Sequence, residues 1–345
     1  MEKIEINLKN LICNCRNIKS KFPGYKYYMG VVKSNAYGLG MKAIKEISKE
    51  MDYLVVGNIE EAIAIRKNKI EVPILVLLPI SQSEAKKYEK YNITATLDCL
   101  DVLKKIKDYK IKIHIKLNTG MNRFGLKNKE QLKEVLSIIS NGNLYLEGIY
   151  THLYSANDKN ITGNQISIFK EMIDFIDYKK IPIIHIYQSQ GLVENIKIDF
   201  ANGVRVGDLM YGICDKKELG FKSTFSLSCN LCSINKVEKG QTIGYDAAFK
   251  CERDEYIGII PIGYSHGITK KQVGTNVYIK DKEYEIIANT MNVTFIKVDN
   301  KTKLNDKVFV YKDIDHIMKL SDQLSTVPQE PMLLLQNIKK KYIYK

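Results

Sequence analysis

The sequence lacks any apolar run of the roughly 18 residues needed to cross a bilayer, so it predicts no membrane-spanning helix. Residues 1–20 also lack an apolar core of signal-peptide length, and we therefore expect a cytoplasmic protein. The seven cysteines are an odd number scattered through 345 residues, which does not indicate a disulfide framework. Cys229 and Cys232 form one CxxC pair, which lacks the second half of a zinc site, so no metal site is expected.

The chain is basic, since 53 Lys and Arg against 39 Asp and Glu give a net charge of +14. A basic balance can indicate nucleic-acid binding. Here, however, the lysines are scattered through helical and turn segments, and the only dense cluster is KKKYIYK at 339–345. We therefore expect a solvated surface and no nucleic-acid partner.

Short apolar, β-branched runs recur through the first two-thirds of the chain and predict eight strands. Most of the gaps between them show the three- and four-residue apolar steps of helices, as at 59–68, 129–140 and 163–178. Eight strand-then-helix units are typical of a (β/α)8 TIM-type barrel, which we place at residues 8–222. The predicted strands are 27–33, 53–57, 73–78, 93–97, 111–117, 146–152, 181–187 and 203–207.

After about residue 222 the sequence changes to strand-like runs separated by Gly- and Asp-containing turns, with little helix between them. This pattern predicts a C-terminal mostly-β domain over residues 223–345, to which residues 1–7 could add a strand. The strand-like runs are 224–237, 256–264, 276–288, 293–299 and 307–312.

Polar residues stand at the C-terminal ends of several predicted barrel strands, which is where barrel active sites are built. A lysine there is unusual, because strand interiors normally exclude it. Plain polar caps on the strands remain the alternative interpretation. The residues are Lys33, Lys116, Arg123, His152, Ser189 and Arg205.

Spaced segments along nearly the whole chain resemble the alanine racemase family, whose members join a pyridoxal phosphate (PLP) barrel to a β domain. VVKSNAYGLG at 31–40 is similar to the family's cofactor-lysine motif, and KLNTGMNRFG at 116–125 to its K-x-D-T-G-M-x-R-x-G segment. Further similar segments follow in the family's order: THLYSAND at 151–158, VRVGDLMYG at 204–212, GQTIGYDAAF at 240–249 and IPIGYSHG at 260–267.

The resemblance implies PLP as the cofactor and assigns residues to hold it. Lys33 would form the Schiff base, for which its amine must be neutral. Tyr37, Ser189 and backbone N–H groups near Gly207 would bind the phosphate, because an anion needs donors on a permissive backbone.

Arg205 would face the pyridine nitrogen of the cofactor. An arginine cannot accept a proton, so the ring should stay unprotonated, and racemisation would be favoured over transamination. His185 would hold Arg205 from behind. The alternative is that His185 is a buried core residue whose hydrogen bonds are satisfied and which has no role in the site.

Racemisation needs an acid–base group on each face of the substrate. The resemblance assigns Lys33 to one face and Tyr245 to the other, with His152 as the expected partner of Tyr245. A tyrosine in a β-rich segment is otherwise more often a core residue. In the family this tyrosine reaches the neighbouring subunit, so a homodimer with composite sites is implied, in which Tyr264 and Met291 also come from the partner.

The substrate end of the site is implied in the same way. Arg123 would bind the cofactor's phenolic oxygen or the substrate carboxylate, and Lys116 matches a lysine that is often carbamylated. Leu39 and Asn118 replace the family's usual His and Asp. Gln329 falls where the family usually has a tyrosine that crowds the substrate side chain. Its amide would enlarge the pocket, so serine is a candidate second substrate.

The sequence therefore predicts PLP-dependent racemisation of L- and D-alanine by a two-base mechanism, and the resemblance implies D-alanine supply for the cell wall. One alternative is a racemase of serine or a broader set of small amino acids, and another is a PLP barrel that does not racemise. A PLP decarboxylase of basic amino acids would want a carboxylate where Arg205 stands.

Overall fold

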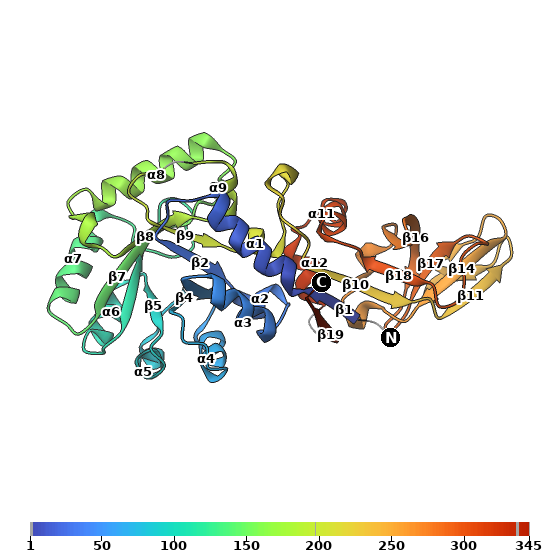
Figure 1. Cartoon of the computed structure of the whole chain (residues 1–345), viewed down its shortest axis with the longest axis horizontal. Helices are drawn as coiled ribbons and strands as arrows, with labels where there is room; N and C mark the ends of the chain where they lie inside the picture. Colours follow the sequence, from blue (N-terminus) through green and yellow to red (C-terminus); the bar gives the residue numbers. More distant parts are fainter. Residues whose placement is uncertain (1–2, 197, 336–337, 345) are drawn as a thin grey trace.

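The computed structural model describes residues 3–196, 198–335 and 338–344. Residues 1, 2, 336, 337 and 345 of the predicted β domain and residue 197 of the predicted barrel lie outside the described residues. Figure 1 shows a barrel joined end to end with a domain built mostly of strands, and β1 and β19 lie between the two. Across the described ranges, no helix combines the length and the apolar composition that crossing a membrane requires.

The barrel is closed by eight parallel strands in chain order, which confirms the predicted fold class. Its helices are α1 (Leu8–Lys21), α3 (Met41–Glu50), α4 (Ile59–Lys67), α5 (Ala85–Lys90), α6 (Leu100–Ile106), α7 (Lys129–Ser140), α8 (Lys159–Ile173), α9 (Ser189–Val193) and α10 (Asp208–Tyr211). Its strands are β2 (Tyr27–Val31), β3 (Tyr53–Val56), β4 (Ile74–Pro79), β5 (Thr94–Leu97), β6 (Lys112–Lys116), β7 (Tyr145–Tyr150), β8 (Ile183–Tyr187) and β9 (Gly203–Val206).

Helix starts in the barrel follow from side-chain caps. Asn58 and Asn128 each accept a hydrogen bond from the backbone N–H three residues later, which satisfies a donor that the first helical turn leaves free. Asp158 caps α8 in the same way, accepting from the N–H groups of Asn160 and Ile161. The helix predicted at 163–178 therefore begins earlier, at Lys159, and it ends at Ile173.

The C-terminal part is one nine-stranded sheet in the order β11-β14-β17-β16-β15-β18-β10-β1-β19, with a small β12-β13 hairpin. Strand β1 (Lys3–Asn7) pairs antiparallel with β10 and parallel with β19, so the first and last described strands lie side by side. The other strands are β10 (Phe225–Asn230), β11 (Ser233–Val237), β12 (Thr242–Ile243), β13 (Phe249–Lys250), β14 (Glu255–Ile260), β15 (Asn276–Ile279), β16 (Lys282–Asn289), β17 (Thr294–Val298), β18 (Lys307–Tyr311) and β19 (Lys340–Ile343).

Two helices in this part were not predicted individually: α11 (Ile314–Gln323) and α12 (Gln329–Leu334). Asp313 caps α11 by accepting from the N–H of His316, and α12 packs against the turn that follows β2. The expectation of little helix between the strands holds up to β18, but α12 brings Gln329 to the barrel.

One continuous apolar core runs from the barrel into the C-terminal sheet. Ile4 and Ile6 of β1 belong to it together with Leu8 and Leu11 of α1, so the first helix joins the two parts. A separate small cluster, which includes Ile243 and Cys251, packs under the β12-β13 hairpin. This cluster supports the segment that carries Tyr245.

Candidate active site

A cavity of about 730 Å³ opens where the barrel strands end at their C-terminal side. The predicted residues from different strands meet in its wall, as the strand-end argument required. His185 is not in the wall and lies behind Arg205. The predicted residues in the wall are Lys33, Tyr37, Lys116, Arg123, His152, Ser189, Arg205 and Gly207, with Gln329 added from α12.

Lys33 begins a left-handed turn, labelled α2 (Lys33–Tyr37), directly after β2. Ser34, Asn35, Ala36 and Tyr37 all have φ between 52° and 57°, a conformation that costs about 1–2 kcal/mol for each residue with a Cβ. The Glu61 carboxylate holds this turn against β3, accepting from the N–H of Ser34 at 2.6 Å and of Gly57 at 2.8 Å. The strained backbone aims Lys33 and Tyr37 into one cavity.

Tyr37, Ser189 and Gly207 meet at one end of the cavity. The N–H of Gly207 donates to Ser189 Oγ at 3.1 Å. A Cβ at position 207 would lie 2.8 Å from the Tyr37 hydroxyl, so glycine is what leaves room for that hydroxyl. Two hydroxyls and a close backbone are suited to an anion such as phosphate.

Arg205 is 3% exposed, and its guanidinium is satisfied by groups other than carboxylates. Nη1 donates to His185 Nδ1 at 2.5 Å, and Nη2 donates to the carbonyl oxygen of Thr151 at 2.7 Å. The Tyr150 ring lies 5.1 Å from the guanidinium carbon, in a cation–π contact. Burial lowers the pKa of Arg205 to about 10.

Positive charge accumulates in the cavity wall around His152 and Lys116. Burial and then the charge of Arg205 lower the pKa of His152 to about 3, so its imidazole is neutral. Burial and then Arg123 lower the pKa of Lys116 to about 8, which is well below that of an ordinary lysine. The cavity therefore favours ligands with negative charge.

Asn118, which replaces an aspartate of the family motif, organises the loop that carries Arg123. Its side-chain oxygen accepts from the N–H groups of Gly120 at 3.1 Å and Asn122 at 3.0 Å, and its amide donates to Asn122 Oδ1. The two backbone bonds need only an acceptor oxygen, which an aspartate would also supply, whereas the bond to Asn122 Oδ1 uses an amide N–H that an ionised aspartate lacks. Leu39, the other departure, is buried core, and its carbonyl accepts from the Tyr342 hydroxyl at 2.9 Å.

Three predicted residues lie outside the cavity of their own chain. Tyr245 is 71% exposed and Met291 is 54% exposed, and both stand on the C-terminal part together with Tyr264. The structure brings Tyr264 close to Met291, since the N–H of Tyr264 donates to Thr290 O and that of Ser265 to Met291 O. A single chain therefore does not unite Lys33 with Tyr245.

Sequence reasoning missed Asp208, which also lines the cavity. Its Oδ1 accepts from Gln329 Nε2 at 2.8 Å, so a carboxyl group lies beside Gly207. Burial raises the pKa of Asp208, while the bond from Gln329 opposes the rise. Tyr150, stacked on His185 at 4.6 Å, was also missed, although a tyrosine at the end of an apolar strand beside a predicted site residue could have indicated it.

Comparison with known families identifies two matching domain models. The model described as alanine racemase, N-terminal domain, matches residues 6–215. The model described as alanine racemase, C-terminal domain, matches residues 224–342. Together they cover both parts of the structure.

Individual proteins are similar over nearly the same length. An alanine racemase of Borreliella burgdorferi is 34% identical over 343 residues, covering 92% of this chain and 91% of that protein. Alanine racemase 1 of Bacillus subtilis is 30% identical over 320 residues, covering 88% and 82%. A solved alanine racemase of Clostridium difficile 630 superposes with a TM-score of 0.92 at 28% identity, covering 100% of this chain and 96% of that one.

The neutral histidines in and behind the cavity wall predict acid sensitivity. Burial lowers the pKa values of His114, His152 and His185 below the ordinary 6.5, so the unfolded chain binds more protons than the folded one below pH 6.5. The stability that they contribute is complete above pH 6.5 and is lost as the pH falls towards the folded-state pKa, about 3 for His152.

Urea unfolding at pH 7 and pH 5.5 should therefore show a decrease in the free energy of unfolding. In His152→Gln the decrease should be smaller by about 1 kcal/mol, because one of the depressed groups is gone. His266→Gln, which replaces a histidine outside the cavity wall, is the control and should behave as wild type. An equal decrease in wild type and His152→Gln would contradict the assignment.

Proposed function

The chain belongs to the alanine racemase family, and from this premise we propose that it interconverts L- and D-alanine with PLP as its cofactor. The observation that carries the proposal is the meeting of Lys33, Tyr37, Ser189 and Arg205 in one cavity at the C-terminal end of the barrel. We place the division between the PLP-binding barrel and the β domain at residues 222 and 223.

The donor set of the cavity fits PLP. The space that Gly207 leaves before Tyr37, together with the Ser189 hydroxyl, would accept the phosphate. Lys33 would bind the aldehyde carbon, and Arg205 would face the ring nitrogen without giving it a proton. When bound, PLP supplies an electron sink that weakens the Cα–H bond of the amino acid.

Two groups of the protein would then move the proton. The Lys33 amine would take or return it on one face of Cα, and the Tyr245 hydroxyl on the other. Because Tyr245 stands outside its own chain's cavity, we propose that Tyr245 of the partner subunit completes the site. The neutral imidazole of His152 would be its hydrogen-bond partner.

A head-to-tail homodimer accounts for the exposed apolar side chains around the cavity and on the β domain. Leu78, Tyr154 and Val327 lie around the cavity with 46–57% of their surface exposed. Tyr264 and Met291 are exposed on the β part and would meet the cavity of the partner, near its entrance and near the substrate carboxylate. Such a contact would bury both sets at once.

Arg123 and Lys116 would form the anion-binding end of the substrate site. The lowered pKa of Lys116 leaves more of its amine neutral at physiological pH than in an ordinary lysine. A neutral amine can add to CO2, forming an N–C bond and releasing one proton, which gives an anionic carbamate. Carbamylation would therefore place a negative charge among the Arg123 and Arg205 cations.

The wider assignment follows the family. We propose a cytoplasmic enzyme whose D-alanine supplies the cell wall. A PLP barrel that does not racemise is disfavoured, because the chain carries a β domain with Tyr245. A decarboxylase of basic amino acids is disfavoured by Arg205, which stands where that chemistry would want a carboxylate.

Two substitutions test the assignment of the two bases. Lys33→Ala should lose the visible absorbance of the bound cofactor and all racemisation. Tyr245→Phe should keep the absorbance and lose at least about 100-fold in kcat, because one face of Cα then has no proton donor. Circular dichroism under the assay conditions would verify that both variants are folded.

The exposed Tyr256, changed to Phe, is the matched control and should keep wild-type activity. Wild-type protein that binds no PLP, or binds it and racemises no amino acid, would overturn the proposed function. Full activity in Tyr245→Phe would overturn only its role as the second base.

Gln329 makes a second substrate testable. It lines the cavity, and its amide is shorter than the tyrosine ring that the family usually has there. We propose that wild type racemises serine as well as alanine, and that Gln329→Tyr lowers kcat/KM for serine about 10-fold relative to alanine. Glu330→Gln, which changes the exposed neighbour, should leave the ratio unchanged. A strict alanine preference in wild type that Gln329→Tyr does not alter would remove the idea.

A further inference from the structure

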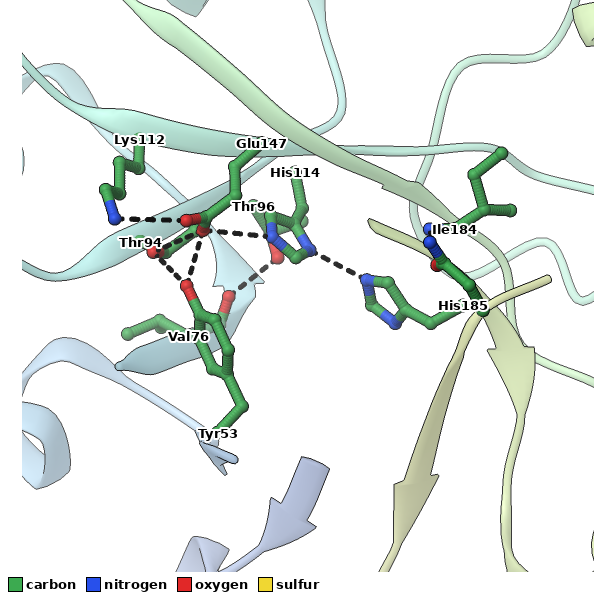
Figure 2. Close-up of polar contacts among 10 residues, drawn as sticks. Tyr53, Val76, Thr94, Thr96, Lys112, His114, Glu147, Ile184 and His185 are labelled. Carbon is green, nitrogen blue, oxygen red and sulfur yellow. Dashed lines mark hydrogen bonds and ion pairs between the residues drawn. The ribbon is translucent and has the colours of Figure 1, made fainter. Parts of the chain in front are cut away.

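A chain of polar side chains crosses the barrel interior behind the active-site cavity. His185 Nδ1 contacts Arg205 Nη1 at 2.5 Å, and His185 Nε2 contacts His114 Nδ1 at 2.7 Å. His114 Nε2 in turn lies 3.3 Å from Glu147 Oε2. Figure 2 shows the stretch from His185 through His114 to Glu147 as one continuous line of contacts.

The two ends of this chain fix the direction of every hydrogen bond. Arginine can only donate, and an ionised carboxylate can only accept. Arg205 therefore donates to His185 Nδ1, His185 Nε2–H donates to His114 Nδ1, and His114 Nε2–H donates to Glu147. Both imidazoles are thereby neutral and in the Nε2–H form, in agreement with the lowering of their pKa values by burial.

Glu147 is held as an anion by several donors. Its Oε2 accepts from the Tyr53 hydroxyl at 2.5 Å and from Thr94 Oγ1 at 3.1 Å, and Lys112 Nζ lies 3.1 Å from Oε1. Burial alone would raise the pKa of Glu147, but the hydrogen bonds from His114 and Tyr53 outweigh it and lower the pKa to about 2. The acceptor end of the chain is therefore charged at physiological pH.

The backbone of the barrel makes room for this chain. The β6–β7 ladder shifts register between Ile113 and His114, so Glu147 has no paired residue on β6, as in a β-bulge. A Cβ on Gly148 would lie 2.7 Å from the His114 ring, and one on Gly203 would lie 3.2 Å from Cβ of His185. Glycines opposite both histidines leave the space that the two rings occupy.

The far end of the chain reaches a second cavity, of about 660 Å³, at the N-terminal ends of the barrel strands. Tyr53, Lys112 and Glu147 lie in its wall, together with Tyr27 and Ile183. Solvent at this mouth helps Glu147 to stay ionised. The chain of side chains thus runs from the second cavity, at one end of the barrel, to the active-site cavity with Arg205 at the other end.

We propose that Glu147 is a positioning residue for the racemisation: through His114 and His185 it fixes the donor directions that hold the Arg205 guanidinium towards the cofactor ring. This inference rests on the proposed function only for its effect on catalysis. Apolar side chains can fill a barrel without loss of stability, so stability alone does not require these four linked polar groups. Because the chain of contacts from Glu147 ends at Arg205, we assign it a role in the active site.

The pattern of hydrogen bonds can be measured directly by NMR, because the whole protein has only five histidines. Holoenzyme labelled with ¹⁵N-histidine should show His114 and His185 in the Nε2–H form, with downfield N–H protons. Glu147→Leu removes the acceptor and should change the signals of both rings, although His185 does not touch residue 147. Glu147→Gln keeps an acceptor oxygen and should retain the wild-type pattern.

Kinetics and absorbance give the catalytic readout. Glu147→Leu should lower kcat for alanine about 10-fold with KM changed less than about 2-fold, and should shift the absorbance maximum of the bound cofactor. Glu147→Gln should recover most of the kcat. Lys112→Met is the matched control, since it removes the exposed partner of Glu147 and leaves the chain to Arg205 unbroken. It should behave as wild type.

Unchanged His185 signals and unchanged kcat in a folded Glu147→Leu protein would overturn the inference, as would an equal loss in Lys112→Met. If Glu147→Leu does not fold, the Gln variant decides, because a lost Nε2–H pattern there contradicts the proposed donor directions. Wild type that racemises nothing would defeat the proposed function, while the histidine spectra would still test the chain. The two failures are thus distinguishable.

Discussion

A buried guanidinium is the constraint around which this site is built. Arg205 lies in the barrel with carbonyls, an imidazole and a tyrosine ring as its contacts, so it stays cationic without an ion pair. Burial first, and then the charges of Arg205 and Arg123, lower the pKa values of His152 and Lys116, and this cationic wall favours anions. The phosphate of the proposed cofactor and the carboxylate of the proposed substrate would match this positive charge. Behind Arg205, the chain of polar side chains ends in a carboxylate, Glu147, at the far side of the barrel.

The backbone carries as much of the design as the side chains. Four consecutive residues from Ser34 to Tyr37 adopt a left-handed conformation that ordinary sequences avoid, and Glu61 stabilises it with two backbone hydrogen bonds. Gly207 leaves space for Tyr37, and Gly148 leaves space for His114. Substitutions at these glycines would act through sterics rather than chemistry. The turn brings Lys33 and Tyr37 to one cavity, and the glycines leave the room that Tyr37 and His114 occupy.

The sequence was sufficient for the eight strands, for α7, and for which polar residues meet in the cavity, because strand ends of a parallel barrel share one face. It was insufficient where tertiary geometry decides. The left-handed turn uses Ser34, Asn35 and Ala36, which have no special preference for it as a run. Glu147 has no paired residue because the register shifts between β6 and β7, and no local pattern indicates that shift. Asp208 and Gln329 meet through α12, a short helix more than a hundred residues later in the chain.

We propose that one chain holds half a site: its cavity contains Lys33, while its exposed Tyr245 would serve the neighbouring copy. Mixing subunits tests this most directly. Lys33→Ala and Tyr245→Phe, each inactive alone, are co-expressed and allowed to assemble at random. In a mixed dimer one site is intact and the other lacks both groups. Because about half of the dimers are mixed, we expect about one quarter of wild-type racemase activity in the mixture. Activity no greater than that of the separate variants would contradict it, because it would mean that both groups act within a single chain.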